Sequence, residues 1–439
     1  MKRSCCVHSL SAAAIGVLLL SSSCGRSPER SESEQVVLRF AHNTTGGKSK
    51  GILDDVCREF GERNPGVRVQ QIVIEDEEYQ DIGLIKLFSG GNPPDVYFQW
   101  GGWLVERDVA AGRAADLTDY LDQDGWKEEF DSIVWPSAMV GDRIYMIPDA
   151  SWVTTVLWYN LEVFRSLHLE VPKTWAEFVA VCRKAKAAGK IPITAGNNEK
   201  WPLGNWAGHI VSRVAGEDLY RKTLQLAPGT SFAHPDFIRA LSLLEDLAKE
   251  RFFNEGVIGL STLEGQMPFR TGEALFHPVG SWITDRLLDE DPDLEYDFFN
   301  TPQIPDGKGN QNSILWLSTG YMVYRDSPRK DLAVRFLRYH ASPEVQRRYV
   351  AIGVCSSIKA GFEGGVEPHL AKIRALVESA TVTVPPGDTG FPVEVAGHFY
   401  DAVSNVVGGL ASSAEALRKC DERVARLRGR DLLGSPGGS

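Results

Sequence analysis

Hydrophobic and polar positions alternate between two periods along the first hundred residues of the chain. Apolar residues in continuous runs of strand length are separated by segments in which apolar residues recur at helical spacing. The predicted elements are strands at 35–41, 67–75 and 95–99, with helices at 52–60 and 79–88 between them. Strands that alternate with helices at this spacing predict a parallel α/β sheet.

The same alternation returns in the middle of the chain. An apolar, β-branched run at 154–159 predicts a strand, and Thr174 with Glu177 forms the pattern of a capping box that opens a helix. A further strand is predicted at 191–195 and a long helix at 235–252. The fold class is therefore α/β over most of the chain.

Composition narrows the class of protein. With 439 residues, 43% hydrophobic and 24% charged, the chain has the proportions of a globular protein of two or three domains. Asp+Glu total 58 against 47 for Lys+Arg, a net charge of −11, and no basic block occurs. These charges argue against nucleic acid as a partner, because nucleic-acid sites need clustered Lys and Arg.

The N-terminus has the pattern of a secretory signal. Two basic residues at positions 2 and 3 precede an apolar stretch at 10–20, and small residues lead to Cys24. The apolar stretch is too short for a transmembrane helix, so 1–23 are predicted to be a signal peptide and the body to lie outside the cytoplasm.

The residues around Cys24 resemble a bacterial lipobox, in which the cysteine is lipidated. Ser21 occupies the position three before the cysteine where the pattern has leucine, and despite this departure we expect Cys24 to be lipidated and to anchor the protein to a membrane. Residues 24–35 are polar and suit a tether between a lipid anchor and the folded body.

Motifs for catalysis, cofactors and metals are missing from the sequence. No nucleophile elbow, zinc-protease helix, Walker loop or dinucleotide-binding motif occurs, so we expect no catalytic residues, no cofactor and no metal. The four cysteines beyond the leader lie far apart, without a C-x-x-C pair: Cys57, Cys182, Cys355 and Cys420. They could pair in three ways or stay as free buried thiols, and the sequence does not decide between these outcomes.

Tryptophan is the residue type that carries candidate chemistry. Several of the eleven tryptophans lie beside Gly, Asn, Ser or Asp instead of in apolar stripes, namely Trp100, Trp103, Trp152, Trp201, Trp206, Trp282 and Trp316. A sugar ring stacks its C–H face on an indole and needs polar side chains at its hydroxyl rim, so these clusters indicate a carbohydrate site. A single tryptophan is more often core packing, the role expected of Trp126, Trp135, Trp158 and Trp175.

Several motifs in order along the chain resemble bacterial extracellular solute-binding proteins that serve carbohydrate ABC importers, the family that includes maltose-binding protein. The matching segments are 89–96, 114–121, 147–148, 158–160, 171–178, 269–274, 279–282, 333–337 and 342–346. The resemblance implies two α/β lobes with strands that cross between them and a ligand cleft between the lobes. Its expected boundaries are 36–147 plus 277–314 for lobe 1 and 148–276 plus 315–439 for lobe 2.

The resemblance also implies the partners and the site. We expect a monomer that binds a small solute, a sugar or oligosaccharide, and delivers it to the transmembrane subunits of an ABC importer. The expected ligand-binding residues are Asn43, Gln99, Trp100, Trp103, Asp149, Trp152, Trp201, Asn205, Trp206, Ser281, Trp282, Trp316, Asp388, Phe391 and Tyr400.

Two other functions fit the same observations. A binder of another small solute, such as a peptide or polyamine, would use the same fold with different cleft chemistry. A secreted glycoside hydrolase needs only two carboxylates brought together in space, which a sequence does not display.

Overall fold

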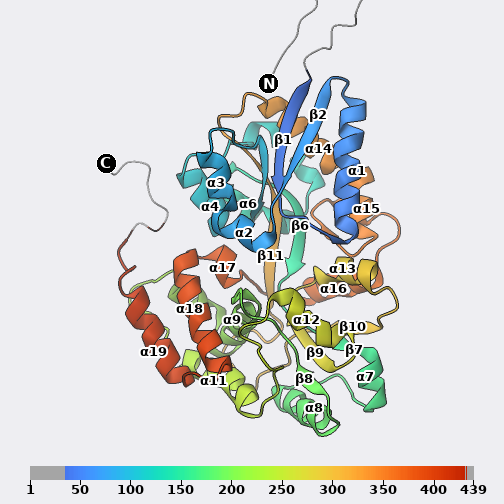
Figure 1. Ribbon diagram of the computed structural model, residues 1–439. Coiled ribbons are helices and arrows are strands. Elements are labelled where there is room, and N and C mark those ends of the chain that lie inside the picture. Colours follow the sequence, from blue (N-terminus) through green and yellow to red (C-terminus); the bar gives the residue numbers. More distant parts are fainter. Residues whose placement is uncertain (1–34, 431, 433–439) are drawn as a thin grey trace, which may run out of the picture. The chain divides into compact units, whose positions relative to one another are not determined.

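The computed structural model describes residues 35–430 and 432 (Figure 1). The predicted signal peptide, Cys24 and all of the predicted tether except its last residue lie outside the described residues. Within the part described, no helix combines the length and the apolar character needed to cross a membrane.

The larger of the two main sheets has seven strands in the order β12-β6-β11-β3-β1-β2, with β13 beside β11. Its strands are β1 (Val36–His42), β2 (Val67–Val73), β3 (Val96–Trp100), β6 (Ile147–Val153), β11 (Ile314–Val323), β12 (Cys355–Ser356) and β13 (Thr383–Val384). β1 pairs in parallel with both β2 and β3, which confirms the predicted parallel sheet. β11 is antiparallel to β3 and β6, so the complete sheet is mixed.

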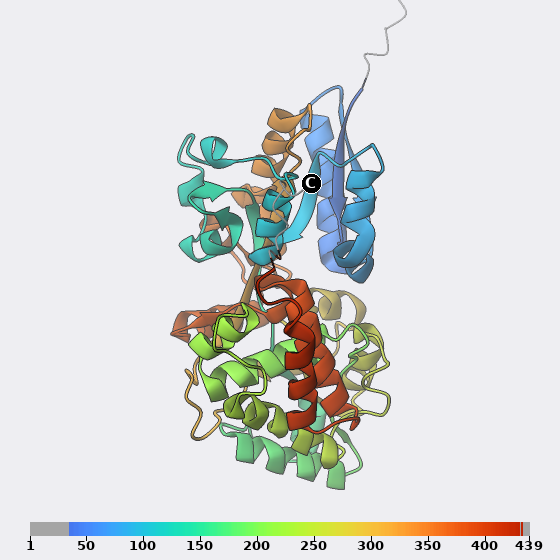
Figure 2. The same ribbon diagram turned by 90° about the vertical axis from the view of Figure 1, so that its left-hand side faces the viewer.

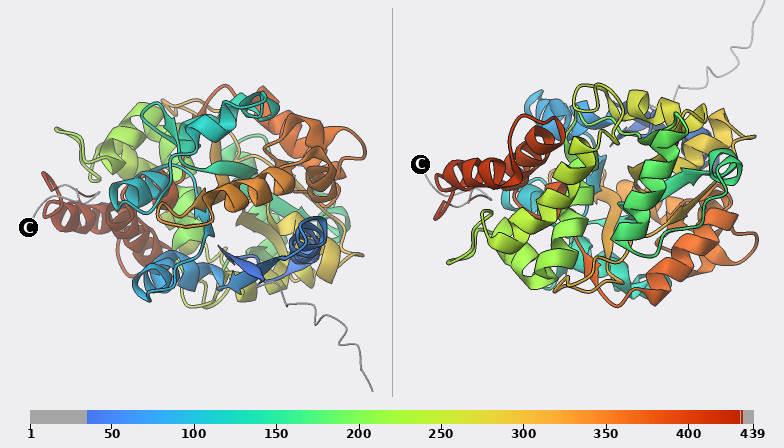
Figure 3. Two further views of the ribbon diagram at one scale, coloured as in Figure 1. Left: turned by 90° about the horizontal axis from the view of Figure 1, so that it is seen from above. Right: turned by 90° about the horizontal axis from the view of Figure 1, so that it is seen from below.

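Helices and turns from two separate stretches of chain pack around this sheet. They are α1 (Gly47–Arg63), α2 (Asp76–Glu78), the π-helix η1 (Tyr79–Gly83), α3 (Leu84–Ser89), α4 (Trp103–Ala110), α5 (Thr118–Leu121), η2 (Lys127–Glu129), η3 (Ser132–Val134), α6 (Trp135–Ala138), α14 (Lys330–His340), α15 (Pro343–Val350) and η4 (Lys359–Phe362), with the hairpin β4 (Met139–Val140) and β5 (Arg143–Ile144). Figure 3 shows α1 and α14 close to the strands when viewed from above. The Phe336 ring of α14 lies 5.2 Å from Phe40 of β1 and 5.3 Å from Phe60 of α1, so an early and a late segment share one core.

A second sheet has four strands in the order β10-β7-β9-β8. Its strands are β7 (Val156–Asn160), β8 (Ile191–Ile193), β9 (Ala274–Val279) and β10 (Tyr296–Phe299). The helices of this region are α7 (Leu161–Ser166), α8 (Trp175–Ala187), α9 (Trp201–Ala215), α10 (Glu217–Leu224), α11 (Pro235–Lys249), α12 (Thr262–Arg270), α13 (Ile283–Glu290), α16 (Pro368–Ser379), α17 (Gly387–Gly390), α18 (Val393–Val407) and α19 (Ser413–Val424). Figure 2 shows α18 and α19 in red beside the green helices; α18 contacts both α9 and α11, and α19 contacts α11.

Local signals explain where several helices begin. The predicted capping box is present, since the Thr174 hydroxyl accepts the Glu177 N–H and the Glu177 carboxylate accepts the Thr174 N–H. α8 therefore starts at Trp175, as its sequence predicts. Equivalent boxes open α12 and α19.

Two large hydrophobic cores divide the body. One contains residues from Leu38 to Ala150 and from Leu317 to Ile358, and the other contains residues from Leu157 to Leu315 and from Val384 to Val424. A smaller third core joins β7, β9 and β10 to α13 and α16. β6 and β11 each contribute side chains to more than one core, so these two strands cross between them.

The cores group the later segments differently from the predicted lobes. Residues 317–358 pack in the first core, although 315–439 were assigned to lobe 2. Residues 277–314, assigned to lobe 1, pack in the second and third cores. The reason is the length of β11, whose start at Ile314 lies in one core while Tyr321, seven residues later, lies in another.

Candidate functional site

A recess with a volume of about 350 Å³ lies between elements of the two large cores. Its walls come from the loops after β1 and β2, from β6 and β11, and from α9, α12, α13 and α17. The position beyond the carboxyl ends of β1 and β2 is where open α/β sheets place ligands. Its volume falls within the range of small-molecule sites.

Tryptophans form one wall of the recess. The rings of Trp201 and Trp282 have centroids 5.6 Å apart, and those of Trp282 and Trp152 are 6.4 Å apart and nearly perpendicular. Trp100 lines the recess as well, held edge-on to Phe98 at 4.9 Å. The Trp152 indole N–H donates to Thr319 Oγ1 at 3.2 Å, which fixes that ring against β11.

Asp149 reaches the recess because of an irregularity in β6. Thr319 of β11 pairs with Ala150 whereas the next residue, Gly320, pairs with Pro148, so Asp149 is the extra residue of a β-bulge. A Cβ at Gly320 would lie 2.2 Å from the Ile147 carbonyl oxygen, so the close strand approach at this bulge requires glycine. Burial raises the pKa of Asp149 above its ordinary value.

A second carboxyl stands at the end of β2. Asn43, just after β1, donates its side-chain N–H to Asp76 Oδ1, and both residues line the recess. Burial raises the pKa of Asp76 from 3.8 to about 6, against the opposing effect of the Asn43 hydrogen bond.

A buried tyrosine, Tyr400, supports another part of the recess wall. The Tyr400 hydroxyl donates to Asn205 Oδ1 at 2.6 Å and accepts the Asp388 backbone N–H at 3.1 Å. Asn205 and Asp388 both line the recess, and burial raises the pKa of Asp388 to about 7. Tyr400 is buried behind Asn205 and Asp388, holds both through its hydroxyl, and does not itself line the recess.

Several polar atoms around the recess have no hydrogen-bond partner. They are Thr154 Oγ1, Gln266 Nε2, His277 Nε2, Asp388 Oδ1 and Thr389 Oγ1. Buried polar atoms are rarely left unpaired in proteins, because each costs free energy. Five of the fourteen such atoms among the described residues belong to residues that line this recess, which makes it a candidate ligand site.

Eight of the fifteen residues expected at a ligand site line the recess: Asn43, Trp100, Asp149, Trp152, Trp201, Asn205, Trp282 and Asp388. The other seven do not line it, and each has another place in the structure. Whether the eight contact a ligand stays a prediction.

Strand alternation separates two of the seven from the recess. Gln99 follows Phe98 and precedes Trp100, both of which line the recess, so its side chain lies on the other face of β3. There it is buried, and its Nε2 donates to Asp108 at 2.6 Å. Trp316 likewise alternates with Leu317 on β11 and packs against the third core.

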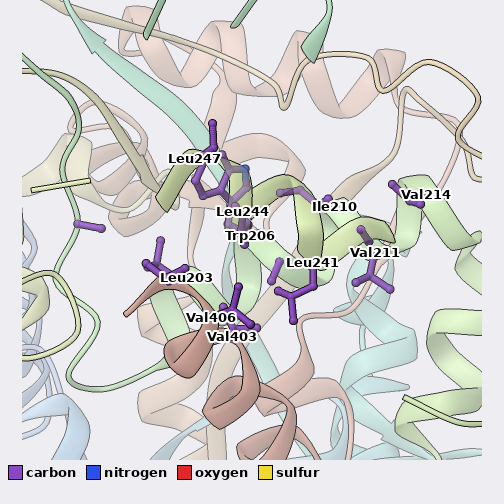
Figure 4. Packing of buried hydrophobic residues seen from close by; sticks show 14 of the residues in the cluster. Leu203, Trp206, Ile210, Val211, Val214, Leu241, Leu244, Leu247, Val403 and Val406 are labelled. Carbon is purple, nitrogen blue, oxygen red and sulfur yellow. The ribbon is translucent and has the colours of Figure 1, made fainter. Parts of the chain in front are cut away.

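Trp206, Phe391 and Trp103 serve hydrophobic packing. Trp206 follows Asn205 on α9, and the helical rotation turns it into the second core, surrounded by leucines and valines (Figure 4). Phe391 is 2% exposed and its ring meets Tyr220 at 5.6 Å. Trp103 is partly buried against the first core at the start of α4.

Ser281 and Tyr400 act behind the recess instead of lining it. The Ser281 hydroxyl accepts the Val153 N–H at 3.3 Å, which ties the segment after β9 to the end of β6. Tyr400 supports Asn205 and Asp388, as described above.

Sequence reasoning missed other polar residues of the recess. Among them are Thr44, Asp76, Gln80, Gln266, Asp285, Arg286, Thr319 and Thr389. The sequence could have indicated Asp76 as a site residue, because it follows a predicted strand of the parallel sheet and ligands bind beyond the carboxyl ends of such strands. Gln266 and Asp285 lie on helices far along the chain and carry no comparable signal.

The described residues include no group of three or more His, Cys, Asp or Glu placed to hold a metal ion. Cys57, Cys182, Cys355 and Cys420, whose pairing the sequence left open, are free and buried. Burial raises the pKa of all four thiols.

Comparison with known proteins gives a consistent picture. The family model described as "Bacterial extracellular solute-binding protein" matches residues 44–347, or 304 of 439 residues. A probable sugar-binding periplasmic protein of Mesorhizobium japonicum is 30% identical over 364 residues, covering 78% of this chain and 81% of the relative. An uncharacterized ABC transporter extracellular-binding protein of Pyrococcus horikoshii is 24% identical, covering 60% of this chain and 61% of the relative.

Among solved structures, one from work on xylan utilization by the thermophilic bacterium Caldanaerobius polysaccharolyticus superimposes with a TM-score of 0.82 at 24% identity. The match covers 89% of this chain and all of that one, and it shows a shared two-lobed fold. On the family match and on the Mesorhizobium relative, the chain belongs to the bacterial extracellular solute-binding protein family.

Proposed function

We propose that the protein is the solute-binding component of an ABC importer and that it captures a sugar or oligosaccharide in the recess. The observation that carries this proposal is the row formed by Trp201, Trp282 and Trp152 along a recess with polar side chains on its other walls. Indoles provide flat apolar faces for pyranose rings, and amide and carboxyl groups bind the hydroxyl rim.

The names of related proteins support the same solute class. The Mesorhizobium relative is described as sugar-binding, and the solved structure belongs to work on xylan utilization. We propose that ligand contacts from both large cores favour a closed arrangement of the lobes, because a ligand shifts a conformational equilibrium only by binding one state better.

We further propose that the protein lies outside the cytoplasm as a lipid-anchored monomer that docks on the importer's transmembrane subunits. The extracellular family assignment supports this location, and the lipobox-like sequence around Cys24 supports the anchor. Lipidation has a direct test, in which full-length protein and its Cys24→Ala variant are expressed and fractionated. We expect the variant to leave the membrane fraction, and equal membrane retention would contradict the anchor.

Binding without turnover is the result that tests the main proposal. Isothermal titration calorimetry against neutral and amino-bearing oligosaccharides, a peptide mixture and spermidine should give saturable binding with at least one oligosaccharide. Product analysis after long incubation should recover that oligosaccharide intact, and appearance of shorter products would favour a glycoside hydrolase. Failure of every sugar to bind while a peptide or spermidine binds would overturn the proposal.

A further inference from the structure

The recess has an unbalanced charge. Its lining includes five carboxyl groups, from Glu75, Asp76, Asp149, Asp285 and Asp388, and one cationic side chain, Arg286. Arg286 forms an ion pair with Glu290 at 3.8 Å. The imidazole of His277 does not compensate, because burial lowers its pKa to about 4 and leaves it neutral.

Four of these carboxyls have no Lys or Arg partner among the described residues. Asp285 instead accepts hydrogen bonds from Ser49. Asp76 is bonded by the neutral amide of Asn43. Asp149 lies 3.4 Å from His340, whose pKa burial lowers, and this favours the neutral imidazole. Asp388 has its Oδ1 without any hydrogen-bond partner.

Asp76 and Asp388 both line the recess and come from different parts of the chain. Asp76 comes from the segment after β2, beside the first core, and Asp388 comes from α17, beside the second. They are close enough for the charge of Asp76 to help raise the pKa of Asp388, although burial is the larger cause. The other titratable groups near Asp388 are the hydroxyls of Tyr400 and Tyr220, which add no positive charge.

A neutral sugar would not supply the missing positive charge. Burial raises the pKa values of Asp76 and Asp388, because holding a desolvated carboxylate without a counter-charge is costly, and without a cation these carboxyls tend to take up protons. A cationic group bound beside them removes that cost and adds charge-assisted hydrogen bonds, which are stronger than neutral ones. The recess is also lined by hydrogen-bonding groups without a partner among the described residues, namely the hydroxyls of Thr154 and Thr389 and the side-chain amide of Gln266. A simple cation would leave these groups unused.

We propose that the recess selects oligosaccharides that carry a free amino group, with the ammonium bound at Asp76 and Asp388 and the pyranose rings on the tryptophan row. This inference rests on the proposed function and specifies its ligand class. A polyamine would satisfy the carboxyls but would not fill the hydroxyl-binding groups or present ring faces to the three indoles. An amino sugar meets both requirements.

The test compares β-1,4-linked glucosamine oligomers of two to four units with fully N-acetylated oligomers of the same lengths. Acetylation removes the positive charge while the rings stay the same. Titration calorimetry of the full protein at about pH 6 should give affinities at least about tenfold higher for the amino oligomers, the difference expected between charged and neutral hydrogen bonds.

Two variants locate the effect. Asp388→Asn and Asp76→Asn should each lower the ratio of the affinity for the amino oligomer to the affinity for the acetylated oligomer. The matched control is Asp142→Asn, which removes one exposed carboxylate in the turn between β4 and β5, away from the recess. It should retain the full preference. Because the two recess variants lie on different elements, misfolding of one leaves the other as a test.

Proton release provides an independent readout. An ammonium bound at Asp388 favours its carboxylate form, so binding at about pH 6 should release protons, measured as a dependence of the calorimetric heat on buffer ionisation enthalpy. The ligand's amino group takes up protons when it binds a carboxylate, so the readout is the difference between wild type and Asp388→Asn. The wild type should release more protons than the variant, and equal values would overturn the placement at Asp388.

The outcomes separate this inference from the function on which it rests. Equal or tighter binding of the acetylated or other neutral oligomers would overturn the amino-sugar inference and leave sugar binding intact. Binding of spermidine with no binding of any sugar would overturn both.

Discussion

Replacing Tyr400 by phenylalanine should weaken ligand binding without creating a cavity in the hydrophobic core. The ring would stay in place, since it packs so closely on α9 that a Cβ at Gly204 would lie 2.4 Å from it. Only the hydroxyl would be lost, together with its 2.6 Å bond to Asn205 and its 3.1 Å bond from the Asp388 N–H.

The magnitude follows from these two bonds. Each contributes about 0.5–1.5 kcal/mol net, so the free energy of unfolding should fall by about 1–3 kcal/mol. Asn205 and Asp388 both line the recess and would lose their common support, and we expect about 1.4 kcal/mol of that loss to be reflected in binding, a tenfold rise in Kd.

Calorimetric titration with the best-bound oligosaccharide measures the Kd, and thermal unfolding measures stability. Tyr220→Phe is the matched control, because Tyr220 is equally buried and near Asp388 but its hydroxyl makes only a 3.4 Å bond to the Pro385 carbonyl. The control should retain its Kd within about twofold. Unchanged affinity in Tyr400→Phe despite lower stability, or an equal loss in the control, would refute the positioning role.

Three further predictions follow from the structure. Trp282→Ala should cost at least about 2 kcal/mol of binding free energy by calorimetry, as central aromatic contacts do, whereas Trp103→Ala, outside the recess, should not; equal losses would contradict the site. Arg213→Met should lower the free energy of unfolding by about 3 kcal/mol, because its buried guanidinium bonds backbone carbonyls, while the Kd stays within twofold; a large change in Kd would contradict a purely structural role. Asp76 and Asp388 should each subtract from the stability of the ligand-free protein as the pH rises from about 4 to 7, because burial raises the folded-state pKa of Asp76 to about 6 and of Asp388 to about 7, whereas an unfolded chain releases these protons near 3.8. A double variant with Asn at both positions should show a flatter pH profile, and parallel profiles would count against it.

The sequence was most informative where the signal is local. The parallel pairing of β1 with β2 and β3 and the start of α8 follow from residue periodicity and from the capping box, which depend on neighbours a few residues apart. Around β11 the hydrophobic cores group residues differently from the predicted lobes, because a continuous strand that runs through two cores has no break in its hydrophobic pattern.

The candidate site likewise was predictable where the signal is local and not where it depends on long-range packing. Tryptophans beside glycine and polar residues led to Trp152, Trp201 and Trp282, which the fold brings together, but the same criterion also selected Trp206 and Trp316. Those two differ from true lining residues by one step along a helix or a strand, and one step changes the face on which a side chain lies.

Composition, periodicity and motif order thus determined the α/β class, the expectation of the family and the supply of indoles for a site, since these depend on residue type and local spacing. The tertiary structure alone decided which indoles share a recess and that Asp76, Asp149 and Asp388 meet there without a cationic partner among the described residues. The physical reason is that a bulge in β6, the length of β11 and a hydroxyl beneath α9 bring together residues separated by up to 312 positions, and no local pattern encodes such distances.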